Sequence, residues 1–212
     1  MQTPPGVLDD DGFPEVLAAA RAGEAWAAEA IFRDLQPRVL RFLRSAEPRA
    51  ADDLAGELWL AVAKGLGGFQ GDLADLHAWV FSIARRRLAD HRRTSARRNT
   101  EPTDGGVFVG RADPADVAGV VIERLSGHDA AALVAALLPA DQAEVVLLRV
   151  LGDLDVSRVA EVMGRSANWV RVVQHRALRH LAERLNDVPA ESRPEIPQIG
   201  VIPAPSPTIC TT

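Results

Sequence analysis

The chain has 212 residues and 47% of them are hydrophobic, enough for the packed cores of two domains. Its single cysteine, Cys210, excludes a disulfide framework and a cysteine-based metal site, which fits a reducing cytoplasm. The acidic start of the chain, with Asp9, Asp10 and Asp11, is unlike a signal peptide, and no apolar run approaches the roughly 18 residues that cross a bilayer. We therefore expect a cytoplasmic protein without a membrane span.

Apolar residues recur at intervals of three and four, and no convincing alternation typical of strands appears. Three helical stretches are expected in the N-terminal half, at residues 14–44, 51–66 and 76–93. Gly23 and Pro37 are expected to interrupt the first of these stretches. The loop Phe69–Asp75 is expected to lead into the third.

Between residues 94 and 126 the periodicity disappears, and glycines and prolines predict a flexible linker. Helical periodicity returns at residues 129–138, 141–151, 156–163 and 167–185. The last segment contains six prolines, which predicts an extended tail. The predicted fold is all-α, with two helical domains at 14–96 and 128–187, a linker at 97–127 and a Pro-rich tail at 188–212.

The formal net charge of −5 hides a polarised distribution. Residues 1–84 carry 7 basic and 13 acidic groups, whereas residues 85–98 carry seven arginines and one aspartate. Such a basic run is usually a solvated face, but it can also contact phosphates and make binding fall steeply with salt.

The segment Asp155–Leu181 is typical of a helix-turn-helix. Asp155 can cap a short helix, Gly164 stands where that helix must end, and Ser166 can cap a longer second helix. In this arrangement the second helix enters the major groove of DNA. Its expected inward residues are Val170, Val173, Ala177, Leu178 and Leu181. An ordinary helical hairpin with solvated polar groups remains the alternative.

Two blocks of residues resemble known sequences. Leu148-Arg149, Val159-Ala160-Glu161, Gly164, Val170-Arg171 and His175-Arg176-Ala177 resemble sigma region 4. Ala51-Asp52-Asp53-Leu54, Gly71-Asp72, Ala78-Trp79-Val80-Phe81-Ser82-Ile83-Ala84-Arg85 and Asp90-His91-Arg92-Arg93 resemble sigma region 2. In this order, over about residues 14–186, they resemble the extracytoplasmic-function (ECF) subfamily of sigma-70 factors.

The resemblance implies a protein that binds core RNA polymerase and directs promoter recognition, DNA melting and transcription initiation. Region 2 would dock on the clamp helices of the largest polymerase subunit and capture the melted −10 element. Region 4 would bind the −35 element and the flap of the second-largest subunit. The implied location is the cytoplasm, with the nucleoid. Family members are commonly held by an anti-sigma factor, which is the further partner that the resemblance implies.

Candidate site residues follow from these blocks. For the −35 element they are Ser166, Asn168, Trp169, Arg171, Val172, Gln174, His175 and Arg176, since Asn, Arg and Gln can bond base edges. For the −10 element the resemblance implies Gln70, Asp72, Asp75, His77, Arg85, Arg92 and Arg93. For polymerase docking it implies Asp52, Asp53 and Glu57, although acidic residues in a first helical turn also complement the helix dipole. We expect Trp79 to be a core residue rather than a base-stacking one, and Phe69 to anchor the loop.

Two other functions compete with this one. A conventional helix-turn-helix regulator would bind duplex DNA without polymerase, and a helical adaptor would bind protein only. An enzyme is not expected, because the five histidines are scattered and no phosphate-binding glycine loop is present. We expect no metal and no cofactor.

Overall fold

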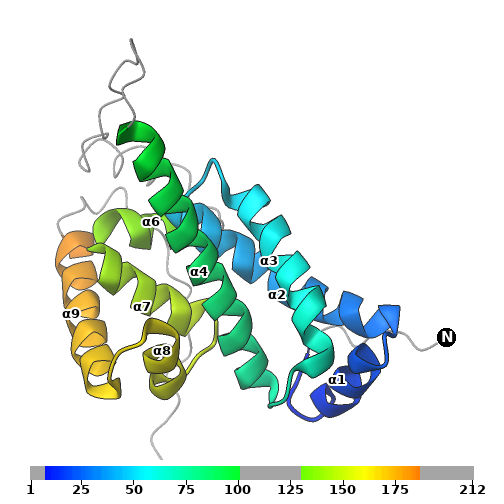
Figure 1. Cartoon of the computed structure of the whole chain (residues 1–212). Helices are drawn as coiled ribbons and strands as arrows, with labels where there is room; N and C mark the ends of the chain where they lie inside the picture. The colour runs from blue at the N-terminus through cyan, green and yellow to red at the C-terminus, as the bar shows by residue number, and fades with distance from the viewer. Residues whose placement is uncertain (1–7, 101–129, 187–212) are drawn as a thin grey trace, which may run out of the picture.

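The computed structural model describes residues 8–100 and 130–186, and their regular elements are all helical, as predicted (Figure 1). The first range forms α1 (Phe13–Arg21), α2 (Ala25–Ala46), α3 (Ala51–Gly65), the 3-10 turn η1 (Leu66–Gly68) and α4 (Leu73–Thr100). The second range forms α6 (Ala130–Leu137), α7 (Ala140–Val150), α8 (Val156–Met163) and α9 (Ala167–Asn186). Most of the expected linker and the whole expected tail lie outside the described residues.

The first expected helical stretch has one break rather than two. Gly23 separates α1 from α2, and its φ of +85° lies in the left-handed region that glycine adopts without strain. Pro37 lies inside the continuous helix α2, so the prediction that it interrupts the helix was wrong. Proline removes one helical hydrogen bond, but its fixed φ is compatible with a helix. The buried stripe of α2, which includes Leu35 and Val39, keeps the helix packed across this position.

Helix α4 begins three residues earlier than predicted because two aspartates cap it. The Asp75 N–H donates to Asp72 Oδ1 at 2.7 Å, and the Asp72 N–H donates to Asp75 Oδ2 at 3.0 Å. This reciprocal arrangement is a capping box, which satisfies two backbone donors of the first turn. Asp75 therefore belongs to the helix and not to the loop. The helix also continues past residue 93 to Thr100.

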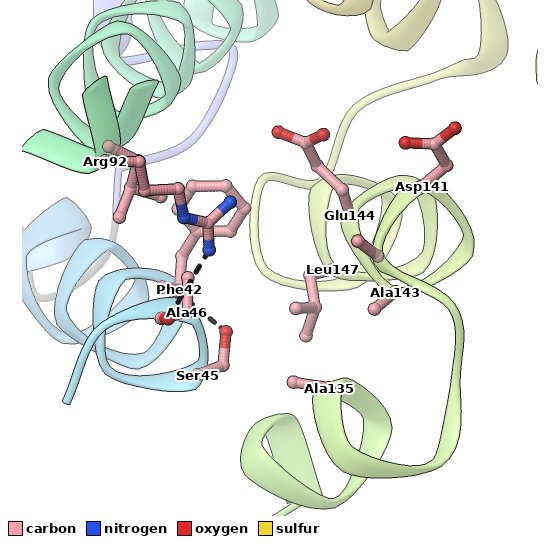
Figure 2. Close-up of a pocket in the computed structure, with 11 residues that line it drawn as sticks. Phe42, Ser45, Ala46, Arg92, Ala135, Asp141, Ala143, Glu144 and Leu147 are labelled. Atoms are coloured by element: carbon pink, nitrogen blue, oxygen red, sulfur yellow. Dashed lines mark hydrogen bonds between the residues drawn. The ribbon is translucent and has the colours of Figure 1, made fainter. Parts of the chain in front are cut away.

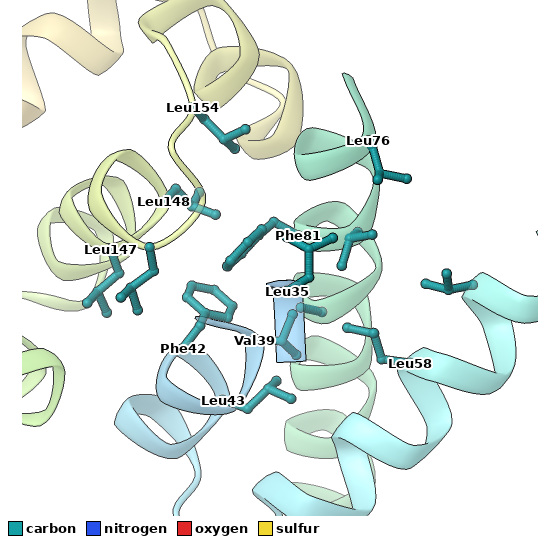
Figure 3. Packing of buried hydrophobic residues seen from close by; sticks show 14 of the residues in the cluster. Leu35, Val39, Phe42, Leu43, Leu58, Leu76, Phe81, Leu147, Leu148 and Leu154 are labelled. Atoms are coloured by element: carbon teal, nitrogen blue, oxygen red, sulfur yellow. The ribbon is translucent and has the colours of Figure 1, made fainter. Parts of the chain in front are cut away.

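The two described ranges share one hydrophobic core (Figure 3). Phe42 of α2 and Phe81 of α4 meet edge to face, with 5.5 Å between ring centroids. Leu147, Leu148 and Leu154 from the second range belong to the same buried cluster, and Figure 3 shows them next to the rings of Phe42 and Phe81. The helices after residue 130 therefore pack directly on those before residue 100.

Candidate nucleic-acid interface

The turn between α8 and α9 has the local geometry that the sequence predicts. Asp155 Oδ1 accepts the Arg158 N–H at 2.8 Å, and this backbone hydrogen bond holds the pKa of Asp155 below its ordinary value. Gly164 ends α8 in the left-handed conformation with φ 64°. Ser166 Oγ accepts the Trp169 N–H at 3.2 Å at the start of α9. Both caps and the glycine turn are confirmed.

Helix α9 turns a polar face to solvent. Val170, Val173 and Ala177 are buried as expected, but Leu178 is 54% exposed, so its prediction as an inward residue was wrong. It lies beyond the edge of the buried stripe. Of the residues predicted to contact the −35 element, Trp169 and Gln174 are half-buried. The others are exposed: Ser166, Asn168, Arg171, Val172, His175 and Arg176. The guanidinium of Arg165 lies 5.4 Å from the ring centroid of Trp169 and helps to fix that ring.

The residues predicted to capture the −10 element have a different environment. Asp72 and Asp75 both bond the side chain of Arg158, which reaches them from α8. Its Nη2 lies 3.0 Å from Asp72 Oδ2 and 3.1 Å from Asp75 Oδ1, while its Nη1 lies 3.1 Å from Asp155 Oδ2. The backbone hydrogen bond from Asp72 lowers the pKa of Asp75, and Arg158 lowers it further.

Sequence reasoning missed Arg158. It stands three residues after a helix cap, where an arginine is unremarkable, and its partners lie 83 and 86 residues away in the chain. No local pattern signals a contact of that range.

His77 was expected to read base edges, but the structure buries it at 4% exposure. Its Nδ1 lies 3.1 Å from the carbonyl oxygen of Gly152, and because a carbonyl can only accept a hydrogen bond, the ring Nδ1–H donates to it. Burial lowers the pKa of His77, and nearby Arg38 lowers it further, against the opposing effect of Asp34 and Asp153. In this arrangement the imidazole is neutral at pH 7 and turned away from solvent.

The arginines predicted to contact the DNA backbone are held by protein groups. Arg85 Nε donates to Glu144 Oε1 of α7 at 2.9 Å, and its Nη1 lies 3.5 Å from the carbonyl oxygen of Val162. Burial raises the pKa of Glu144, although Arg85 opposes this. Arg92 Nε donates to Glu47 Oε1 at 2.9 Å. Arg93 pairs with Asp90, three residues earlier in α4.

Gln70 is exposed, and Phe69 and Trp79, of which Trp79 was expected in the core, are half-buried and pack against the core. The rings of Phe69 and Trp79 meet with 5.3 Å between their centroids, and the Phe69 carbonyl accepts a hydrogen bond from Arg21. A Cβ at Gly65 would lie 2.7 Å from Trp79 Cζ2, so only glycine leaves room for this ring. Phe69 therefore anchors the loop, and Trp79 packs against the end of α3.

The acidic residues predicted to dock on polymerase lie on the exposed side of α3. Asp52 lies in the first turn and bonds Arg44 at 3.0 Å, so it complements the helix dipole without capping by its side chain. Asp53 and Glu57 lie four residues apart on one stripe, which continues to Leu60 at 64% exposure. Leu60 was not among the predicted residues, and its exposed side chain follows these acidic groups on α3.

Within residues 8–100 and 130–186, no group of three or more His, Cys, Asp or Glu side chains is arranged to hold a metal ion. Among the helices of these same ranges, none is long and apolar enough to cross a membrane.

Comparisons with known proteins agree with the two blocks. Residues 31–98 match the family model described as Sigma-70 region 2, and residues 128–181 match Sigma-70, region 4. The chain is 33% identical over 181 residues to the ECF RNA polymerase sigma factor BldN of Streptomyces coelicolor, covering 84% of this chain and 68% of BldN. It is 31% identical over 172 residues to the ECF sigma factor ShbA of Streptomyces griseus, covering 75% of this chain and 87% of ShbA.

The ECF sigma factor SigD of Mycobacterium tuberculosis is 29% identical over 189 residues, covering 86% of this chain and 88% of SigD. Among solved structures, CnrH in complex with the cytosolic domain of CnrY matches with a TM-score of 0.53 and 19% identity. The match covers 84% of this chain and 98% of CnrH. That likeness supports the fold alone.

Proposed function

This chain belongs to the ECF RNA polymerase sigma factors, which direct RNA polymerase to promoters, and on that premise we propose that its two regions divide promoter recognition between duplex and melted DNA. A sigma factor is not an enzyme, and the polymerase performs the chemistry. The observation that carries the proposal is the doubly capped α8–α9 turn, which supports an exposed polar face on α9.

The −35 element is assigned to α9. Asn168, Arg171 and Gln174 can make hydrogen bonds to base edges in the major groove, while Arg176 and the start of the helix suit phosphates. Ser166 caps the helix, and Trp169, Val172 and His175 complete the contact face. Exposure of most of this face supports the assignment, because these side chains need no rearrangement before they meet DNA.

The −10 element is assigned to the loop before α4 and to α4 itself. Gln70, Asp72, Asp75 and His77 would bond unstacked bases, and Arg85, Arg92 and Arg93 would contact phosphates. The position of Gln70 at an exposed loop supports this, as does the Arg-rich surface of α4. Since Asp72 and Asp75 also cap α4, their roles in stability and in DNA capture coincide.

Polymerase docking is assigned to Asp52, Asp53 and Glu57 of α3, with Leu60 as an apolar addition to that surface. The proposed polymerase partners are the clamp helices for region 2 and the flap for region 4. The proposed domains are residues 14–96 and 128–187, with 97–127 as the linker and 188–212 as a tail. This activity belongs in the cytoplasm at the nucleoid, and an anti-sigma factor is a further proposed partner.

Reconstitution with core RNA polymerase tests the proposed function. Genomic DNA is transcribed with core enzyme, with and without this protein, and the transcript starts are sequenced. We expect a small set of new starts preceded by two shared sequence elements. A conventional regulator would instead bind duplex DNA without polymerase and would add no starts to core enzyme alone.

A further inference from the structure

We propose that α9 selects one base of the −35 element by an apolar contact, in which Val172 packs against the C5-methyl group of a thymine in the major groove. The inference deepens the proposed function and rests on it, because it adds a residue that reads shape to residues that read hydrogen bonds. Among the four DNA bases, only thymine presents a methyl group in the major groove.

Val172 is an apolar side chain within the polar face of α9. It is 41% exposed, and it lies four residues after Asn168 and three residues before His175, both of which are exposed. Residues three and four positions apart are neighbours on a helix surface, so polar side chains flank the valine on both sides along the helix. The face assigned to the −35 element therefore has an apolar centre.

The core side of α9 is built from other residues. Val170, Val173 and Ala177 are the buried ones, and much of Val172 is left in water. Leu178, which is also apolar and exposed on α9, lies six residues further on and hence about 120° around the helix. Only Val172 of this exposed pair shares the face with Asn168 and His175, where a methyl group of DNA would remove it from water.

The valine is also a rigid side chain. Two methyl groups on Cβ leave valine with one strongly preferred χ1 rotamer in a helix, so little side-chain entropy is lost on contact. Helical side chains lean toward the N-terminus, which places the Val172 methyl groups over the turn that contains Asn168 and Trp169. The N-terminal turns of a recognition helix are the part that meets base edges.

Trp169 extends this apolar centre. It lies three residues before Val172, so the two side chains are neighbours on the helix surface. The indole ring packs against the core on one side, and the Arg165 guanidinium lies 5.4 Å from its centroid. A thymine methyl group against Val172 would thus also lie near a ring whose position is fixed before DNA binds.

The same valine disfavours the other bases. Its side chain has no hydrogen-bond donor or acceptor, so the amino group of cytosine or adenine, or O6 of guanine, would lose its partner in water without gaining one. Thymine offers the valine a methyl group instead. Burial of one methyl group corresponds to roughly a fourfold change in affinity.

Deoxyuridine, which differs from thymidine only by the missing methyl group, tests this contact. Holoenzyme is assembled from core RNA polymerase and the full-length protein, and the −35 element is taken from the transcript starts that it produces. Each thymine of that element, on either strand, is replaced in turn, and fluorescence anisotropy at fixed salt gives the affinity for the promoter duplex. We expect one thymine at which the replacement weakens binding roughly fourfold.

Variants assign this loss to Val172. Val172→Ala should bind the thymine duplex about as weakly as the parent binds the deoxyuridine duplex, and it should bind the two duplexes alike. Alanine is a better helix former than valine, so α9 should stay folded. Leu178→Ala removes an exposed apolar side chain from another side of α9 and should keep the preference of the parent for thymine. An effect of deoxyuridine on the DNA alone would be equal for all three proteins.

The proposal is overturned if no replacement weakens binding by the parent, or if Val172→Ala loses as much affinity as the parent at the same thymine. These results are distinguishable from a failure of the proposed function. If the parent starts no transcription with core enzyme, the proposed function fails and the thymine contact fails with it. Normal transcription with equal affinity for both duplexes rejects the thymine contact alone.

Discussion

The two surfaces assigned to DNA differ in how they are built. Helix α9 presents its polar face through contacts a few residues apart, from the Asp155 cap to the Gly164 turn and the Ser166 cap. The start of α4 combines a local cap with contacts to residues more than 70 positions away, at Gly152 and Arg158. Local contacts build the first surface, whereas contacts between distant parts of the chain hold several side chains of the second.

The largest expected effect comes from the core that joins the two regions. Leu148→Ala should lower the free energy of unfolding by about 3 kcal/mol, because the buried leucine would leave a cavity beside Phe81. Chemical denaturation measures this change. Val150→Ala on the same helix is the control, since Val150 is 70% exposed and should change stability by less than about 0.5 kcal/mol.

Substitutions on the exposed face of α9 should change the affinity for DNA rather than the stability of the protein. Arg171→Ala should weaken duplex promoter binding by the holoenzyme by about 1–3 kcal/mol if the arginine bonds a base edge. Fluorescence anisotropy at fixed salt measures the loss. Arg179→Ala, which removes an arginine paired with Glu183 further along α9, should have a smaller effect. Equal losses for both variants would indicate a general charge effect and would argue against base contact at Arg171.

At the start of α4, a substitution should act through the loss of the helix cap. Asp72→Ala removes one half of the capping box and should lower the free energy of unfolding by about 1 kcal/mol. Asp53→Ala, at an exposed position in the first turn of α3, is the comparison and should change stability less. If the two variants unfold alike, the capping role of Asp72 is wrong.

A smaller effect should appear with pH. Burial lowers the pKa of His77, so the folded state binds fewer protons than the unfolded chain, in which histidine has a pKa of about 6.5. Stability from this site is therefore complete above that value and falls as the pH decreases below it. Denaturation midpoints between pH 7.5 and 5.5 should show the decline, and His77→Gln should flatten it. His175→Gln, on the exposed face of α9, should leave the slope unchanged.

The sequence predicts the exposed surface well because its signals are local. Asp155, Gly164 and Ser166 each act within a few residues, and the buried stripe of α9 follows from helical spacing. It predicts the surroundings of α4 poorly, since Arg158 and Glu144 find their partners only through tertiary packing. The error at Pro37 has the same origin, because burial on both sides of the proline outweighed its local tendency to break the helix.

The central claim is that this chain directs core RNA polymerase to promoters through the exposed polar face of α9. Transcription of genomic DNA by core enzyme, with the parent protein or with Arg171→Ala, tests it most directly. We predict new transcript starts preceded by two shared sequence elements with the parent protein, and weaker transcription from the same starts with Arg171→Ala. The absence of new starts with the parent protein would contradict the account.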